Sequence, residues 1–158
     1  MKTKILLLTL SCLFTANVQA QQKLTLKELT GTWEVFSMDI PGEIYFNLQT
    51  DSIAVKPEDG EDSTMIAFKN KMIKESLKAQ VSKMFFYMDS DGTMYDGTLT
   101  KDPTKKMGSY MEDKAVLRIK EKETGEEKEI RLSLKDNVLT MLTEDKGVRV
   151  TMLCKKRL

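Results

Sequence analysis

The sequence predicts a mainly β protein, an antiparallel barrel of about eight strands with one amphipathic helix inserted between the first strand and the rest. From residue 84 onward, short apolar runs are separated by turn residues roughly every 8–12 positions, which is typical of antiparallel sandwiches and barrels. Several of these runs alternate apolar and polar side chains, as strands do when one face is buried and the other is wet. Residues 64–84 instead show apolar side chains at helical spacing.

The first predicted strand covers residues 32–40 and ends before a Pro-Gly pair. Residues 43–56 are ambiguous, because their two apolar runs, 44–46 and 53–55, are short. These runs could form two short strands around a turn at residues 50–51.

The predicted helix covers residues 64–84, follows an acidic loop, and has Asp62 or Ser63 as its N-cap. Its apolar residues share one face, which we expect to pack against the sheet or over an open barrel end, while its lysines face solvent. The apolar face consists of Met65, Phe68, Met72, Ile73, Leu77 and Met84, and the lysines are Lys71, Lys74 and Lys78. The alternative is a basic helix on a membrane surface. The helix contains no Trp, which favours packing against the sheet.

The later strands are separated by residues that favour turns, of which Asp91-Gly92 is the strongest hairpin signal. They are predicted at residues 85–88, 93–100, 107–111, 117–119, 130–135, 138–143 and 148–154. Because a slip of one residue would move every side chain to the other face, the alternation also fixes the register of these strands.

Residues 1–20 have the pattern of a cleavable secretory signal peptide. Lys2 and Lys4 form a positive n-region, residues 5–14 are an apolar stretch, and small or short side chains precede a cleavage site after Ala20. An apolar stretch of ten residues is shorter than the about 20 that span a bilayer. We therefore expect export to the periplasm or the medium, without integral membrane insertion.

Lipoprotein processing at Cys12 is the alternative to ordinary cleavage. The Leu expected three residues before such a cysteine is Thr9 here, and the apolar core would shrink to six residues. Ordinary cleavage leaves residues 21–158 as a single domain, which is large enough to bury a core without disulfides. The cleaved chain has only Cys154, so it forms no intramolecular disulfide, and we expect this thiol to act as a small buried hydrophobe.

The composition excludes several classes of function. Residues 1–20 contain two lysines and no acidic residue, so residues 21–158 carry one more acidic than basic side chain. A balance so close to neutrality predicts no nucleic-acid partner. Histidine is absent, which removes the commonest general base and metal ligand. We therefore expect no catalytic residues, no metal site and no cofactor; the protein is not expected to be an enzyme.

The segment Asp89-Ser90-Asp91-Gly92 resembles part of a calcium loop. An EF-hand loop needs Gly at its sixth position and Glu at its twelfth, and neither register starting in this segment provides both. We therefore interpret the segment as a hairpin turn. Ten methionines lie beyond residue 20. We interpret them first as core residues, and as the alternative we consider that they line an adaptable ligand surface.

Four short motifs resemble lipocalin-like domain proteins of the kind that Bacteroides-type bacteria export. They are the Gly31-Thr32-Trp33 strand opening, the aromatic hairpin at residues 86–94, the Gly108-Ser109-Tyr110 step and the closing hairpin at residues 137–156. The resemblance implies a lipocalin-like barrel in which Trp33 is a structural plug at one end. It also implies a cation over that ring, which Arg157 or Arg149 would supply. The Arg-x-Tyr pair of fatty-acid carriers is Arg149-Val150-Thr151 here.

Two functions follow from this interpretation. The first is an exported, non-enzymatic lipocalin-like protein that binds a small apolar or amphipathic ligand. The second is an interaction or scaffold module of the cell envelope with a filled barrel and no small-molecule ligand. The predicted ligand site lies between helix and sheet and comprises Phe86, Met88, Tyr95, Met72 and Leu77. The competing interpretation is that these residues form a dry contact. The oligomeric state stays open.

Overall fold

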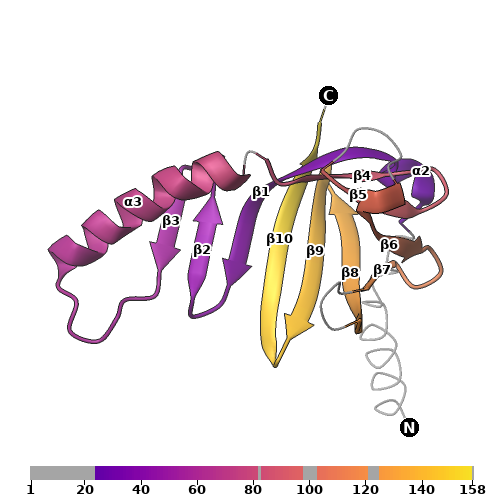
Figure 1. Ribbon diagram of the computed structural model, residues 1–158. Coiled ribbons are helices and arrows are strands. Elements are labelled where there is room, and N and C mark those ends of the chain that lie inside the picture. The colour runs from indigo at the N-terminus through magenta and orange to yellow at the C-terminus, as the bar shows by residue number, and fades with distance from the viewer. Residues whose placement is uncertain (1–23, 82, 98–102, 121–124, 158) are drawn as a thin grey trace, which may run out of the picture.

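The computed structural model describes residues 24–81, 83–97, 103–120 and 125–157, so the predicted signal peptide and part of the predicted strand at 93–100 lie outside it. Within these residues, ten antiparallel strands form one sheet, and β1 and β4 to β10 close into a barrel of eight strands (Figure 1). The predicted fold class is confirmed. The strands are β1 (Gly31–Ile40), β2 (Ile44–Asn47), β3 (Ser52–Val55), β4 (Phe85–Met88), β5 (Thr93–Asp96), β6 (Lys106–Met111), β7 (Val116–Lys120), β8 (Glu127–Lys135), β9 (Val138–Asp145) and β10 (Val148–Lys156). The helices are α2 (Leu26–Leu29), α3 (Ser63–Val81) and the short 3₁₀ turn η1 (Pro103–Lys105).

Strand β1 has three partners and closes the barrel. Along one edge it pairs with β10, from Trp33 opposite Lys156 to Asp39 opposite Thr151. Its other edge is divided, because the first residues pair with β4 and the last with β2. The β2–β3 hairpin therefore continues the sheet outward from the barrel. Figure 1 shows this hairpin and α3 on the opposite side of β1 and β10 from β4 to β7.

The ambiguous segment 43–56 forms the two short strands β2 and β3. They are paired from Ile44 opposite Val55 to Asn47 opposite Ser52, and the turn between them includes Asp51 with a φ of +54°. Asp tolerates this left-handed conformation better than most residues. The hairpin interpretation is therefore confirmed.

Helix α3 begins at Ser63, where the Asp62 Oδ1 accepts hydrogen bonds from the backbone N–H groups of Thr64 and Met65, both at 2.9 Å. Asp62 is therefore the N-cap. The helix ends at Val81, three residues before the predicted end. Among the described residues, no helix is long and apolar enough to span a bilayer.

The prediction for the buried face of α3 is partly wrong. Met65, Phe68 and Met72 are 56%, 65% and 60% exposed, whereas Ile73 and Leu77 are half-buried and Val81 is buried. At 3.6 residues per turn, the first three residues lie on nearly the opposite side of the helix from the last three. The sequence pattern merged two separate apolar faces into one.

Ion pairs explain why α3 presents this face to the hairpin. Lys74 and Lys78 both pair with Asp51 in the β2–β3 turn, Lys78 at 2.9 Å, and the pKa of the Asp51 carboxyl is lowered by these two lysines. Lys69 pairs with Glu58 at 2.7 Å and with Glu61 at 3.3 Å in the preceding loop. Lys74 and Lys78, which were predicted to face solvent, therefore help to hold the helix beside β3.

The end of the barrel at the start of β1 is closed by side chains and by α2. The Trp33 ring is 1% exposed, and its Nε1–H donates to the Leu29 carbonyl at 2.7 Å. Helix α2 is fixed by a capping box between Thr25 and Glu28. The Tyr110 hydroxyl donates to the Leu24 carbonyl at 2.6 Å, which holds the chain across the same end.

The cation over Trp33 is Lys156, not Arg157 or Arg149. The Lys156 Nζ lies 5.4 Å from the Trp33 ring centre and donates to the Glu28 carbonyl at 3.1 Å. Directly opposed residues in an antiparallel pair point to the same face, and Lys156 is the partner of Trp33. Arg157 is one residue further along and lies over Phe85 at 5.4 Å.

Gly31 is required for this arrangement. Its φ of +126° is accessible almost only to glycine, and a Cβ there would lie 2.9 Å from the Lys156 Cε. The Gly-x-Trp motif thus has two physical roles: the glycine admits the lysine stem, and the tryptophan receives its charge.

The interpretation of residues 89–92 as a hairpin turn is confirmed. The Asp89 N–H donates to the Thr93 carbonyl at 2.9 Å, and Gly92 has a φ of +82°. The Thr93 N–H donates to the Asp91 Oδ1 at 2.8 Å. In the described part of the chain, no group of three or more acidic, Cys or His side chains is placed to hold a metal ion.

The closed end predicts the fluorescence of Trp33, the only tryptophan of the chain. Because the ring is buried and its N–H is bonded to a carbonyl, we expect a blue-shifted emission that acrylamide quenches poorly. Unfolding in guanidinium should shift the emission to the red. A solvent-like emission maximum in the native protein would contradict the plugged end.

The same end predicts a pH dependence. Burial, and secondarily the charges of Glu112 and Glu28, raise the pKa of Tyr110 from 10.0 to about 12. The folded state therefore holds this proton more tightly than the unfolded state, so the contribution of Tyr110 to stability is complete below pH 10 and falls as the pH rises toward about 12. Urea unfolding across this range should show that decline, and Tyr110→Phe should remove it. An equal decline in both proteins would refute the assignment.

Candidate ligand-binding cavity

A cavity of about 300 Å³ lies inside the barrel, at the end away from Trp33. All eight barrel strands contribute a residue to its wall, and most of these residues are apolar. In chain order from β1 to β10 they are Val35, Phe86, Met94, Met107, Ile119, Ile130, Met141 and Met152. The cavity is therefore enclosed by the barrel wall itself.

The cavity forms because the inward residues are arranged in two layers along the barrel. Toward the closed end, the inward residue of most strands is buried in the core: Trp33, Met88, Tyr110, Leu117, Leu132, Leu139 and Cys154. On six of these strands, the residue two positions further from the closed end lines the cavity: Val35, Phe86, Ile119, Ile130, Met141 and Met152. Alternation along the strands produces both layers. The barrel is thus filled at one end and hollow at the other.

Four methionines give the cavity wall its character. Met94 and Met141 are buried, whereas Met107 and Met152 are half-buried, and Met152 is directly opposite Met141 between β10 and β9. Unbranched thioether side chains change rotamer at low cost, so the wall can adjust to ligands of different shape.

Polar groups are found only where the cavity opens. Lys83 and Met84 from the link between α3 and β4, Phe85 at the start of β4 and Asp96 at the end of β5 complete the lining. The Val35 N–H donates to the Met84 carbonyl at 3.0 Å, so β1 anchors this link at the cavity opening.

Cys154 lies in the packed layer and is chemically inert in the folded state. Its side chain is fully buried, its Sγ lies 3.7 Å from the Met141 Sδ, and burial raises its pKa to about 12. A nucleophilic cysteine needs the opposite environment, exposed and electropositive. The interpretation of Cys154 as a buried hydrophobe is confirmed.

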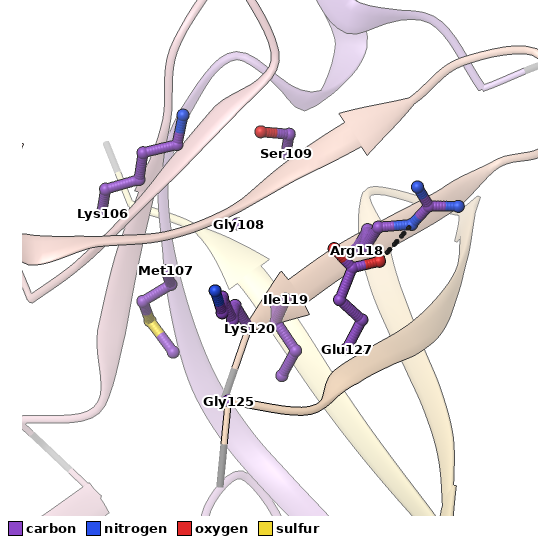
Figure 2. Close-up of a pocket in the computed structure, with 9 residues that line it drawn as sticks. All are labelled: Lys106, Met107, Gly108, Ser109, Arg118, Ile119, Lys120, Gly125 and Glu127. Atoms are coloured by element: carbon purple, nitrogen blue, oxygen red, sulfur yellow. Dashed lines mark ion pairs between the residues drawn. The ribbon is translucent and has the colours of Figure 1, made fainter. Parts of the chain in front are cut away.

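A second pocket, of about 540 Å³, lies on the wall of the barrel at β6 and β7 (Figure 2). It shares Met107 and Ile119 with the interior cavity, so the two spaces adjoin at these side chains. Its lining is more polar than that of the cavity and comprises Lys106, Met107, Gly108, Ser109, Arg118, Ile119, Lys120, Gly125 and Glu127.

The charges of this second pocket are unevenly compensated. The Arg118 guanidinium pairs with Glu127 at 3.6 Å and with Glu129 at 3.2 Å. Lys106 and Lys120 are exposed, and within the described residues neither has a carboxylate within ion-pair distance. Among the described residues, the pocket therefore has two lysines without a paired carboxylate, beside the apolar side chains that it shares with the interior cavity.

The structure does not bring the five predicted site residues together. Phe86 lines the interior cavity, and Met88 is buried in the packed layer. Tyr95 is on the other face of β5, where it packs against Tyr87 with ring centres 6.4 Å apart. Met72 is exposed on α3, and Leu77 packs against the β2–β3 hairpin.

The space between α3 and the β2–β3 hairpin measures only about 10 Å³. Of the five predicted site residues, only Leu77 lies in this interface, so the competing interpretation of a dry contact among all five is also wrong. The prediction assumed that α3 lies over the aromatic strand that follows it, but the helix lies beside β3. Ile119, Ile130 and Met152 of the cavity wall lie on the apolar side of strands that alternate apolar and polar residues in the sequence. Met94, Met107 and Met141 line the cavity because they lie just beyond the end of the packed layer, and the sequence does not show where that layer ends.

No family model, no curated protein and no solved structure matches this chain.

Two phenylalanines provide a matched test of this geometry. Phe86→Ala removes a buried side chain from the barrel wall and should destabilise the protein by about 3–5 kcal/mol. Phe68→Ala removes an exposed side chain from α3 and should change stability by no more than about 0.5 kcal/mol. Urea unfolding measures both, and similar losses for the two variants would contradict the described position of α3.

Proposed function

We propose that this protein is an exported, non-enzymatic lipocalin-like protein that binds a small apolar or amphipathic ligand inside its barrel. The observation that carries the proposal is the cavity of about 300 Å³, walled by one inward residue from each barrel strand. Small-molecule sites are typically concave, apolar and about 300–1,000 Å³ in volume, with a few polar groups that orient the ligand.

The distribution of side chains supports binding over a filled barrel. A filled barrel has bulky layers along its whole length, as the closed end has around Trp33, Leu117 and Leu139. The cavity layer instead contains flexible methionines around empty space. Apolar cavities lose dispersion contacts, so an empty one reduces stability unless a ligand fills it.

The non-enzymatic part of the proposal is supported by the state of Cys154. Cys154 is the one cysteine in residues 21–158. Its thiol is buried, and burial raises its pKa to about 12, so it does not ionise readily to the nucleophilic thiolate. Export is supported by the pattern of residues 1–20, and the lipocalin-like assignment by the Gly-x-Trp motif, whose glycine and tryptophan both have a role at the closed end.

The test fills the cavity. Met152→Trp adds an indole to the cavity wall, and Met152→Leu, which nearly preserves volume, is the control. We expect the neutral fluorescent probe N-phenylnaphthylamine to bind the wild type and the control, and to bind Met152→Trp at least about tenfold more weakly, a loss of about 1.4 kcal/mol. Native mass spectrometry of the wild type from its own cells should show a retained lipid-sized mass. Equal probe binding by all three folded proteins would refute the proposal.

The exposed face of α3 favours the second function, an interaction module of the cell envelope. Met65, Phe68 and Met72 form an apolar stripe on the solvent side of the helix, and exposed apolar stripes often mark interaction surfaces. A photo-reactive phenylalanine analogue at position 68 should form one defined adduct in cells if this function is correct. Dispersed or absent labelling, with a retained ligand mass, supports the cavity function instead.

A further inference from the structure

The wall of the barrel is split between β6 and β7 at one end. These strands pair from Gly108 opposite Ile119 to Met111 opposite Val116, and the pairing does not extend to Met107 or Lys120. The unpaired ends nevertheless stay in the sheet with their outer neighbours. Lys106 is opposite Tyr95 of β5, and Lys120 is opposite Glu127 of β8.

The split begins at Gly108, where the two strands come closest. A Cβ at this position would lie 2.3 Å from the Arg118 carbonyl oxygen, so the approach tolerates only glycine. The pocket of about 540 Å³ lies at this point: Ser109 and Arg118 line it on the paired side, and Lys106 and Lys120 line it beyond the last pair (Figure 2). The split therefore has a defined position, set by the backbone.

The pocket at the split has charged side chains in its outer part and shares two apolar side chains with the barrel cavity. Lys106 and Lys120 line its outer part, while Met107 and Ile119 line both this pocket and the barrel cavity. A bulge in the β5–β6 pairing between Met94 and Tyr95 accompanies this change of direction along β6. A ligand in this position would meet ammonium groups outside and a methionine-rich wall inside.

The acidic residue of the lining does not neutralise these lysines. Glu127 is opposite Lys120 in the sheet, but its carboxylate pairs with Arg118, which also pairs with Glu129. Two ammonium groups on one pocket attract a negative group, and the attraction is stronger where one side of the pocket excludes water.

We propose that the split between β6 and β7 binds the anionic head group of a single-chain amphiphile through Lys106 and Lys120, with its apolar tail passing Met107 and Ile119 into the barrel. This inference rests on the proposed ligand-binding function and names the chemical class of the ligand. The opening at Lys83 and Asp96, where opposite charges line the cavity together, offers no comparable preference for an anion.

The test compares head groups on one tail by isothermal titration calorimetry. Decanoate and decanol are the probes, Lys106→Met/Lys120→Met is the variant, and Lys114→Met/Lys135→Met is the control that removes the same charge elsewhere. Since exposed ion pairs contribute up to about 1 kcal/mol each, the variant should bind decanoate about five- to tenfold more weakly than the wild type. Decanol affinity should be unchanged in both double variants. Raising the salt concentration should weaken decanoate binding only while both lysines are present.

The outcomes separate this inference from the proposed function. The head-group assignment is overturned if Lys106→Met/Lys120→Met changes the affinities for decanoate and decanol equally. If Met152→Trp still weakens the binding of both probes, the binding function remains intact. If neither probe binds the folded wild type, the binding function fails and this inference fails with it. Circular dichroism and melting temperature must match the wild type, since Met retains the apolar stem of Lys.

Discussion

The divided edge of β1 is the constraint on which the rest of the structure depends. Strand β1 pairs with β10 from Trp33 to Asp39, but shares its other edge between β4 and β2. The pairing with β4 closes the barrel, and the pairing with β2 sends a hairpin and α3 outward. The bulge between Val35 and Ser37 lies at the junction of these two regions. A bulge bends a strand and increases its twist. Such a bend allows β1 to pair with β4 in the barrel at one end and with β2 in the outward hairpin at the other.

The same strand determines which end of the barrel is filled. Trp33 is near the start of β1, so its ring, the α2 helix and Lys156 of the last strand all gather at one end. Val35 is the next inward residue, and it already lines the cavity. The change from packed core to hollow therefore occurs within one alternation of the strand, and the same step is repeated at Leu117 and Ile119 on β7.

Local pattern was enough to predict most of the barrel strands, the Asp-Gly hairpin and a helix cap at Asp62 or Ser63, because each depends on neighbouring residues. Three features depend on pairing between distant residues and were not predicted correctly. The cation over Trp33 is Lys156 because of the β1–β10 register, and α3 is rotated because Asp51 binds Lys74 and Lys78. The five predicted site residues are not brought together for the same reason: Met72 and Phe86 belong to elements whose sequence proximity does not place them side by side.

A barrel can keep an unfilled interior only if its stability comes from elsewhere. Here the packed layer, the Trp33 and Tyr110 hydrogen bonds, and the capping box of α2 all lie at one end. The cavity layer consists of residues whose individual packing is less specific, above all methionines. Substitutions in that layer can therefore change which ligand fits while the closed end maintains the fold. The separation also explains why the most constrained residues of the family-like motif, Gly31 and Trp33, are at the end of the barrel where no ligand is expected.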